Sequence, residues 1–277
     1  MLERLGIITP AVHLKEAAIL EVKDVSVRYN GTMALEGVSF RLSVGERVAV
    51  VGPNGAGKST LFKVIAGVLP PTTGEVRIAG CTPETHICIA YIPQRSEVDW
   101  SFPVTVEDVV MMGRYGKLGV LRRPGRRDRE IVRTCLETVG LAELAKRQIG
   151  ELSGGQQQRM FIARALAQEA RLMLMDEPLS GLDVTSQERI LALLDELRAQ
   201  GVTILMAIHD LGQASAYFDR VMLLKGRVLG FGRPEEVFTP ENLARAYGGN
   251  LRLVETPEGL MVLSDTCCSG GIYAGRH

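Results

Sequence analysis

A glycine-rich segment that ends in Gly-Lys-Ser-Thr occupies residues 52–60, directly after the apolar run 47–51. A G-x-x-x-x-G-K-[ST] pattern between a strand and a helix wraps a polyphosphate in backbone N–H groups, and the helix N-terminus adds partial positive charge. Lys58 would supply a charge for the β- and γ-phosphates, and the Ser59 hydroxyl is placed to ligate Mg²⁺. The predicted nucleotide-binding residues are Gly52, Pro53, Asn54, Gly55, Ala56, Gly57, Lys58, Ser59 and Thr60.

A second candidate anion site lies about a hundred residues further on, where residues 152–156 read Leu-Ser-Gly-Gly-Gln. The segment opens a stretch that is expected to be helical as far as Ala167. Ser153 can cap this helix, and the glycines expose backbone N–H groups at its positive end. The residues of this site are Ser153, Gly154, Gly155 and Gln156.

Two carboxylates follow the apolar run 172–175. Asp176, at the end of the expected strand, suits a Mg²⁺ partner, and Glu177 can orient and activate water. Such a pair taken alone is more often a solvated turn. The order of glycine-rich loop, Leu-Ser-Gly-Gly-Gln and strand with Asp-Glu is far more specific.

With these three motifs the chain resembles the ATP-binding cassette family, the nucleotide-binding subunits of ABC transporters, from about Ile19 to Tyr247. The resemblance implies that Tyr29 stacks on adenine and that Asp183 belongs to the D-loop. The alternative for Tyr29 is a role in packing only. The alternative for His209 is a structural histidine whose hydrogen bonds are satisfied at the end of a strand. The implied catalytic residues are Glu177, His209, Gln94 and Lys58. The implied Mg²⁺ ligands are Ser59, Gln94 and Asp176, so ATP and Mg²⁺ are the expected cofactors.

The fold class that this resemblance implies is α/β: a P-loop NTPase core with a RecA-like mixed sheet, an antiparallel β subdomain and an inserted helical signature subdomain at about 95–160. Residues 1–18 are expected to be an N-terminal extension, 19–250 the nucleotide-binding domain and 251–277 a C-terminal tail. Apolar residues recur at helical spacing within 128–147, in agreement with the insertion. Thr185 and Glu188 have the spacing of a capping box at the start of a later helix. A hairpin is expected at 220–229, with its turn at 225–226.

Composition narrows the possible partners. The chain of 277 residues has 32 basic and 32 acidic residues, which does not favour nucleic acid, and the basic stretch 122–127 is more typical of a solvated loop. No apolar run approaches the roughly 18–20 residues that span a bilayer. Charged residues also interrupt the N-terminal region, which therefore lacks the apolar core of a signal peptide. We expect a protein at the cytoplasmic face of the inner membrane, held there by a permease. Five cysteines without a secreted pattern are expected to be reduced thiols, and the pair Cys267-Cys268 is weak evidence for a metal site.

The family resemblance also implies partners. Two copies would pack head to tail, each ATP lying between the glycine-rich loop of one copy and the signature of the other. Residues 96–117 are similar to the ATPase subunits of bacterial manganese, zinc and iron importers, which implies membrane permease subunits and an extracytoplasmic metal-binding protein. Trp100, Phe102 and Met111 are candidate permease anchors, or else subdomain core. An importer for siderophore, haem or cobalamin stays open, as does a soluble, non-transport ABC ATPase.

Overall fold

A six-stranded sheet forms the centre of the computed structural model, which describes residues 18–29, 31–79, 81–82, 88–118 and 123–248 and the backbone of 251–256 and 259–264. Its strands are β3 (Arg47–Val51), β5 (Ile89–Ile92), β6 (Leu172–Asp176), β7 (Thr203–Ile208), β8 (Arg220–Lys225) and β9 (Arg227–Gly232). They lie in the order β5-β6-β7-β3-β8-β9; neighbours are parallel except for β8 and β9, which form the predicted hairpin. The carboxyl ends of the five parallel strands therefore share one edge of the sheet.

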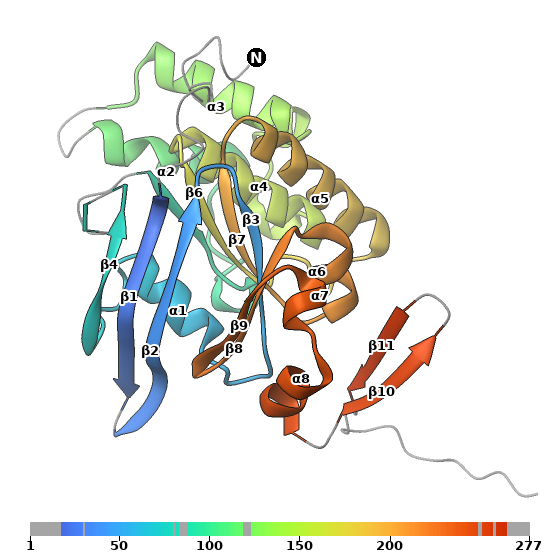
Figure 1. The fold of residues 1–277 in the computed structure, drawn as a ribbon. Helices are drawn as coiled ribbons and strands as arrows, with labels where there is room; N and C mark the ends of the chain where they lie inside the picture. Colours follow the sequence, from blue (N-terminus) through green and yellow to red (C-terminus); the bar gives the residue numbers. More distant parts are fainter. Residues whose placement is uncertain are drawn as a thin grey trace, which may run out of the picture.

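A three-stranded antiparallel sheet lies beside this central sheet (Figure 1). It consists of β1 (Ala18–Tyr29), β2 (Thr32–Ser43) and β4 (Thr73–Ile78), in the order β2-β1-β4. Strand β3 shows how the two layers meet, because Val48 and Val50 pack with the antiparallel sheet while Ala49 and Val51 pack with the helices on the other face. The central sheet is thus covered on both faces, which explains the continuous apolar runs of its strands.

Helices occupy the chain between β5 and β6 and cover one side of the central sheet (Figure 1). The insertion contains α2 (Val106–Leu118), α3 (Arg126–Thr138) and α4 (Gly154–Ala167), with 3₁₀ turns at Arg95–Glu97, Ala142–Leu144 and Ile149–Glu151. The other helices are α1 (Lys58–Ile65), α5 (Val184–Ala199), α6 (Leu211–Tyr217), α7 (Pro234–Val237) and α8 (Pro240–Tyr247). The predicted mixed α/β fold is confirmed, but the helical pattern within 128–147 is only partly right. Helix α3 ends at Thr138, and Gly140 follows with a φ of 66°, a left-handed conformation that ends helices.

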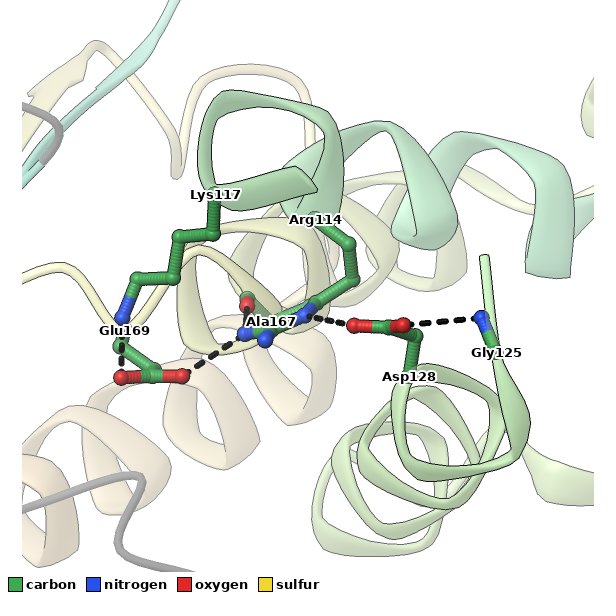
Figure 2. Close-up of polar contacts among 6 residues, drawn as sticks. All are labelled: Arg114, Lys117, Gly125, Asp128, Ala167 and Glu169. Carbon is green, nitrogen blue, oxygen red and sulfur yellow. Dashed lines mark hydrogen bonds and ion pairs between the residues drawn. The ribbon is translucent and has the colours of Figure 1, made fainter. Parts of the chain in front are cut away.

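One buried arginine joins the helices of the insertion (Figure 2). The Arg114 guanidinium, on α2, donates to the Asp128 carboxylate of α3 at 3.1 Å, to the Ala167 carbonyl at 2.7 Å and to the Glu169 carboxylate at 2.7 Å. Lys117 also pairs with Glu169. The N-terminal half of the insertion is thereby attached to the end of α4 and to the segment that leads into β6.

Beyond α8 the chain forms a two-stranded antiparallel hairpin, β10 (Leu251–Thr256) and β11 (Gly259–Ser264). The predicted tail therefore contains regular structure, while Cys267 and Cys268 lie outside the described residues, as does nearly all of the predicted N-terminal extension. Within the part of the chain that the structure describes, no helix is both long and apolar enough to cross a membrane.

Candidate nucleotide-binding site

The glycine-rich loop follows β3 directly and leads into α1, as the sequence predicts. Two of its glycines are required by sterics. A Cβ on Gly52 would lie 2.1 Å from the Leu224 carbonyl oxygen, and one on Gly57 would lie 2.8 Å from that of Ala34. Gly57 also has a φ of 95°, which disfavours any L side chain. The loop therefore passes so close to neighbouring backbone that these two positions have no room for a side chain.

Lys58 is buried inside this loop with only 6% of its surface exposed. Its ammonium group donates to the carbonyl oxygens of Gly52 at 2.8 Å and Pro53 at 3.2 Å. Burial lowers the pKa of Lys58, whereas the carboxylates of Glu177 and Asp176 oppose that shift. The lysine is thus held by the carbonyl oxygens of the loop, within electrostatic reach of Asp176, which ends β6, and of Glu177, which follows it.

Asp176 is the last residue of β6 and is 1% exposed. Neither of its carboxylate oxygens has a hydrogen-bond partner of ordinary length among the described residues. Burial raises the pKa of Asp176, and Glu177 adds to the rise, while the nearby Ser59 hydroxyl and Lys58 oppose it. A buried carboxylate without donors is costly, so it calls for a cation. Oxygen atoms of carboxylate and hydroxyl groups are the ligands that Mg²⁺ takes in proteins, and Asp176 and Ser59 fit that ion.

Glu177 is held between two polar side chains, Gln94 and His209, which follow the strands on either side of β6. One carboxylate oxygen lies 2.5 Å from His209 Nε2, and the other accepts from Gln94 Nε2 at 3.1 Å. The hydrogen bond with His209 lowers the pKa of Glu177; burial opposes it, and the charges of His209 and Lys58 add to the lowering. Glu177 also has a φ of 51°, an uncommon backbone conformation that recurs at functional sites. The arrangement keeps an ionised carboxylate oriented next to Asp176.

Sheet order explains why these residues meet. Gln94 follows β5, Glu177 follows β6, His209 follows β7 and the glycine-rich loop follows β3, and these four parallel strands are consecutive in the sheet. Ligands of open α/β sheets bind outside the carboxyl ends of the strands. Four segments that are distant in the sequence thus build a single edge. Tyr29, at the end of β1, is 44% exposed, so its ring is available for stacking.

The signature segment forms the start of α4. The Ser153 hydroxyl accepts from the Gln156 N–H at 3.4 Å, and the Ser153 N–H donates to Gln156 Oε1 at 2.8 Å, so the predicted cap is present and is a capping box. Among the described residues, no hydrogen bond or ion pair connects this helix end with the glycine-rich loop. Within one copy, this helix end instead adjoins the D-loop region, where a Cβ on Gly154 would meet Leu182 and one on Gly155 would meet Ser186.

The D-loop, Ser180–Asp183, follows Glu177 closely and leads into α5. Helix α5 begins at Val184 and is capped by Asp183, whose carboxylate accepts from the Ser186 N–H at 2.9 Å and the Ser186 hydroxyl at 2.8 Å. The predicted capping box of Thr185 and Glu188 is wrong, because Asp183 caps the helix two residues earlier and Thr185 lies within the first turn. Two residues that motif analysis missed, Gln187 and Gln213, line a hollow of about 230 Å³ next to Glu177 and His209.

The candidate permease anchors differ in exposure. Phe102 is 56% exposed, and Met112 and Tyr115 on α2 are also exposed. Trp100, in contrast, packs edge-on against Phe161 of α4, and its indole N–H donates to the Arg95 carbonyl at 3.1 Å. Met111 is likewise packed against the core. Trp100 and Met111 are therefore partly buried against the core, and Phe102 is the most exposed of the three candidates.

Comparison with known proteins agrees with this geometry. The model of the family "ABC transporter" matches residues 35–180. The manganese transport system ATP-binding protein MntB of Halalkalibacterium halodurans is 45% identical over 251 residues, which cover 89% of this chain and 98% of that protein. The chelated iron transport system membrane protein YfeB of Yersinia pestis is 50% identical over 238 residues, covering 84% and 80%.

Among solved structures, a metal-chelate type ABC transporter in an inward-facing conformation superposes with a TM-score of 0.77 at 30% identity, covering 90% of this chain and 99% of that one. The chain belongs to the ABC transporter family. It is an ATP-binding subunit of that family, an ABC-type ATPase.

Proposed function

We propose that this ATPase powers an importer that takes up a transition metal ion, manganese, zinc or iron, through a separate membrane permease. The observation that carries the catalytic part is Glu177, held between His209 and Gln94 beside the unpartnered carboxylate of Asp176. Support for the cargo comes from the relatives named for manganese and chelated iron transport. The ATPase contacts a permease and not the cargo, so its site is compatible with each of these metals.

In the proposed reaction, the loop from Gly52 to Thr60 binds the ATP phosphates with its backbone N–H groups and Lys58, while Tyr29 stacks on adenine. Mg²⁺ would be held by Asp176, Ser59 and Gln94, and when bound it neutralises charge on the β- and γ-phosphates. Glu177 orients the attacking water and accepts its proton, and its low pKa keeps it ionised for that role. His209 fixes the Glu177 carboxylate from the opposite side.

A head-to-tail homodimer would bring the two anion-binding helix ends together, the glycine-rich loop of one copy facing the signature of the other. In that dimer the γ-phosphate lies between Lys58 and His209 of one copy and Ser153 and Gly155 of the other. Gln156 belongs to the same signature helix end, and Asp183 lies near the contact between copies. Hydrolysis removes the bridging phosphate and releases the dimer, which is a switch driven by a single group.

The permease is proposed to dock at residues 96–117, where Phe102, Met112 and Tyr115 are exposed. ATPase subunits of transporters in this family work with membrane permease components, and this contact would hold the subunit at the cytoplasmic face of the membrane. An extracytoplasmic metal-binding protein would deliver the cargo. Phe102→Ala should abolish uptake while the purified subunit keeps its ATPase activity and melting temperature; unchanged uptake would contradict this docking site.

A siderophore, haem or cobalamin importer is the alternative, because it shares the catalytic residues; the metal-chelate type transporter among the structural neighbours favours it. Gene deletion in the source organism separates the two functions. We expect accumulation of radioactive manganese, zinc or iron to fall and to return with the wild-type gene, but not with Glu177→Gln. If free-metal uptake persists while haem or siderophore uptake fails, the metal-ion assignment is wrong and the ATPase assignment stands.

A further inference from the structure

The side chain of Gln187, in the first turn of α5, is bonded to the D-loop backbone. Its amide nitrogen donates to the carbonyl oxygens of Leu182 at 3.0 Å and Leu179 at 3.3 Å. Carbonyl oxygens only accept, so the two contacts determine which end of the Gln187 amide is nitrogen. The Gln187 oxygen therefore faces away from the D-loop and is available as an acceptor.

That oxygen accepts a hydrogen bond from Gln213 Nε2 at 2.8 Å. Gln213 lies in the first turn of α6, four residues after His209, and its backbone N–H is bound by the capping carboxylate of Asp210 at 2.9 Å. The Gln187–Gln213 amide pair thus connects the D-loop backbone with the segment that positions His209. Both glutamines line the hollow that also contains Glu177, Gly181 and His209.

At this contact the D-loop has a backbone conformation that favours glycine. Gly181 lies between the two carbonyls that Gln187 binds and has a φ of 70°, and a Cβ there would meet nothing within 4 Å. Backbone freedom, and not lack of space, is therefore what glycine provides at this position. Because the Asp183 carboxylate is occupied in capping α5, the Gln187 side chain is the described connection from the D-loop to α6.

We infer that the Gln187–Gln213 pair is a positioning link, through which the conformation of the D-loop sets the place of His209 and of the Glu177 carboxylate that it contacts. The inference rests on the catalytic roles proposed above for Glu177 and His209. His209 and Glu177 lie 2.5 Å apart, and a misplacement of about 1 Å at a reacting group can reduce a rate by about a hundredfold. Neither glutamine contacts nucleotide in the proposed site, so the link acts on turnover and not on ATP binding.

The test uses Gln187→Met, Gln213→Met and the double variant in the full-length chain. Methionine keeps an unbranched side chain of similar length with good helix propensity and removes the hydrogen bonds. Since each variant loses the hydrogen bond between the two side chains and so releases the link, we expect kcat to fall about tenfold in each single variant, which corresponds to about 1.4 kcal/mol in the activation free energy. The KM for ATP should stay within about twofold, and the double variant should be no slower than the slower single variant, because both changes break one link.

Glu188→Met is the matched control, because it introduces the same residue at an exposed neighbouring position of α5. Its kcat should equal that of the wild type. The link is refuted if either glutamine variant keeps wild-type kcat per folded molecule, or if the losses of the two variants multiply in the double variant. A fall in melting temperature with unchanged kcat would also refute it, because that outcome is a structural role only.

Glu177→Gln, measured in the same series, keeps the two proposals apart. If Glu177→Gln is inactive while both glutamine variants turn over normally, the link is wrong and the catalytic site stands. If Glu177→Gln itself turns over normally, the proposed catalytic site is wrong.

Discussion

Two buried aspartates of this chain are in opposite electrostatic situations. Asp128, in the helical insertion, is 8% exposed and accepts hydrogen bonds from Arg114 at 3.1 Å and from the Gly125 N–H at 2.9 Å (Figure 2). Asp176, at the sheet edge, is still more buried, yet neither of its oxygens has a hydrogen-bond partner of ordinary length in the described part of the chain, although the hydroxyl groups of Ser59 and Tyr91 are near it. Buried polar groups are nearly always paired, so the unpaired one needs an explanation.

Their pKa shifts differ in the same way. Burial pushes the pKa of Asp128 upward, but the Gly125 N–H and Arg114 together hold it below its ordinary value. Burial raises the pKa of Asp176, and the opposing groups do not reverse that rise. A carboxylate that the protein itself satisfies maintains the fold, whereas a carboxylate left unsatisfied is retained for a ligand. The Arg114 cluster (Arg114, Lys117, Asp128 and Glu169) therefore stabilises the fold, and the sheet edge is a binding site.

Glu177 tests this comparison most strongly. Its carboxylate is paired within the protein, as that of Asp128 is, yet we assign it to catalysis at the sheet edge. Glu177→Gln keeps its shape and removes the base, so we expect ATP turnover to fall by about 10²–10⁴. ATP binding, followed with a fluorescent analogue, should persist, and the protein should accumulate as a closed dimer. Turnover close to that of the wild type would place Glu177 with the structural carboxylates.

The Arg114 cluster should respond in stability. Arg114→Met leaves the buried carboxylate of Asp128 and the half-buried carboxylate of Glu169 without this partner, and removing one member of a buried ion pair costs about 3–5 kcal/mol in the free energy of unfolding. Urea unfolding at neutral pH measures this loss. Arg133→Met, at an exposed position of α3, is the control and should lie within about 0.5 kcal/mol of the wild type.

The pH dependence of that loss provides a further check. The pKa values of Asp128 and Glu169 are both lowered in the folded state; for Glu169, burial acts to raise the pKa, but Lys117 and Arg114 together outweigh it. A lowered pKa contributes stability that is present above the unfolded value, about 4, and is lost as the pH falls through the folded value. The difference between wild type and Arg114→Met should therefore shrink below about pH 4. A difference that is independent of pH would show that packing, and not charge, stabilises this cluster.

How far the sequence predicts each region depends on how local its interactions are. The strand β3, its glycine-rich loop and the Ser153 cap are encoded in contiguous residues, and all three were predicted. The partners of Arg114 lie 14, 53 and 55 residues away, and no motif connects them. Trp100 could be assigned to the surface or to the core until its contact with Phe161 was known. The cap of α5 was misplaced because a Thr-x-x-Glu spacing and an Asp at the preceding turn compete, and sequence alone does not rank them.

Lys58 tests the same comparison with a cation, because it is a buried charge that we assign to ligand binding and not to the stability of the fold. Lys58→Ala removes a charge that faces the phosphates in the ground state, and a hydrogen bond to a charged group is worth about 1.5–3 kcal/mol. We expect the Kd for ATP, measured by titration with a fluorescent analogue, to rise by about 10–100-fold. Lys63→Ala, on the same helix and paired with Glu97, is the control that should leave binding unchanged. Equal affinity in wild type and Lys58→Ala would contradict the phosphate-binding role of the loop.

The smallest effect is expected at Asp176, and its sign is the informative part. In EDTA and without nucleotide, Asp176→Asn replaces a buried carboxylate that has no donors by a neutral amide of the same shape, so the free energy of unfolding should rise by about 1 kcal/mol. Asp128→Asn should do the opposite, because it weakens a satisfied ion pair. When Mg²⁺ and ATP are added, the wild type should gain stability by binding them, and Asp176→Asn should gain less, so that the order of the two proteins reverses. A loss of several kcal/mol in EDTA would show that Asp176 is held by the fold after all, and the distinction between the two aspartates would fail.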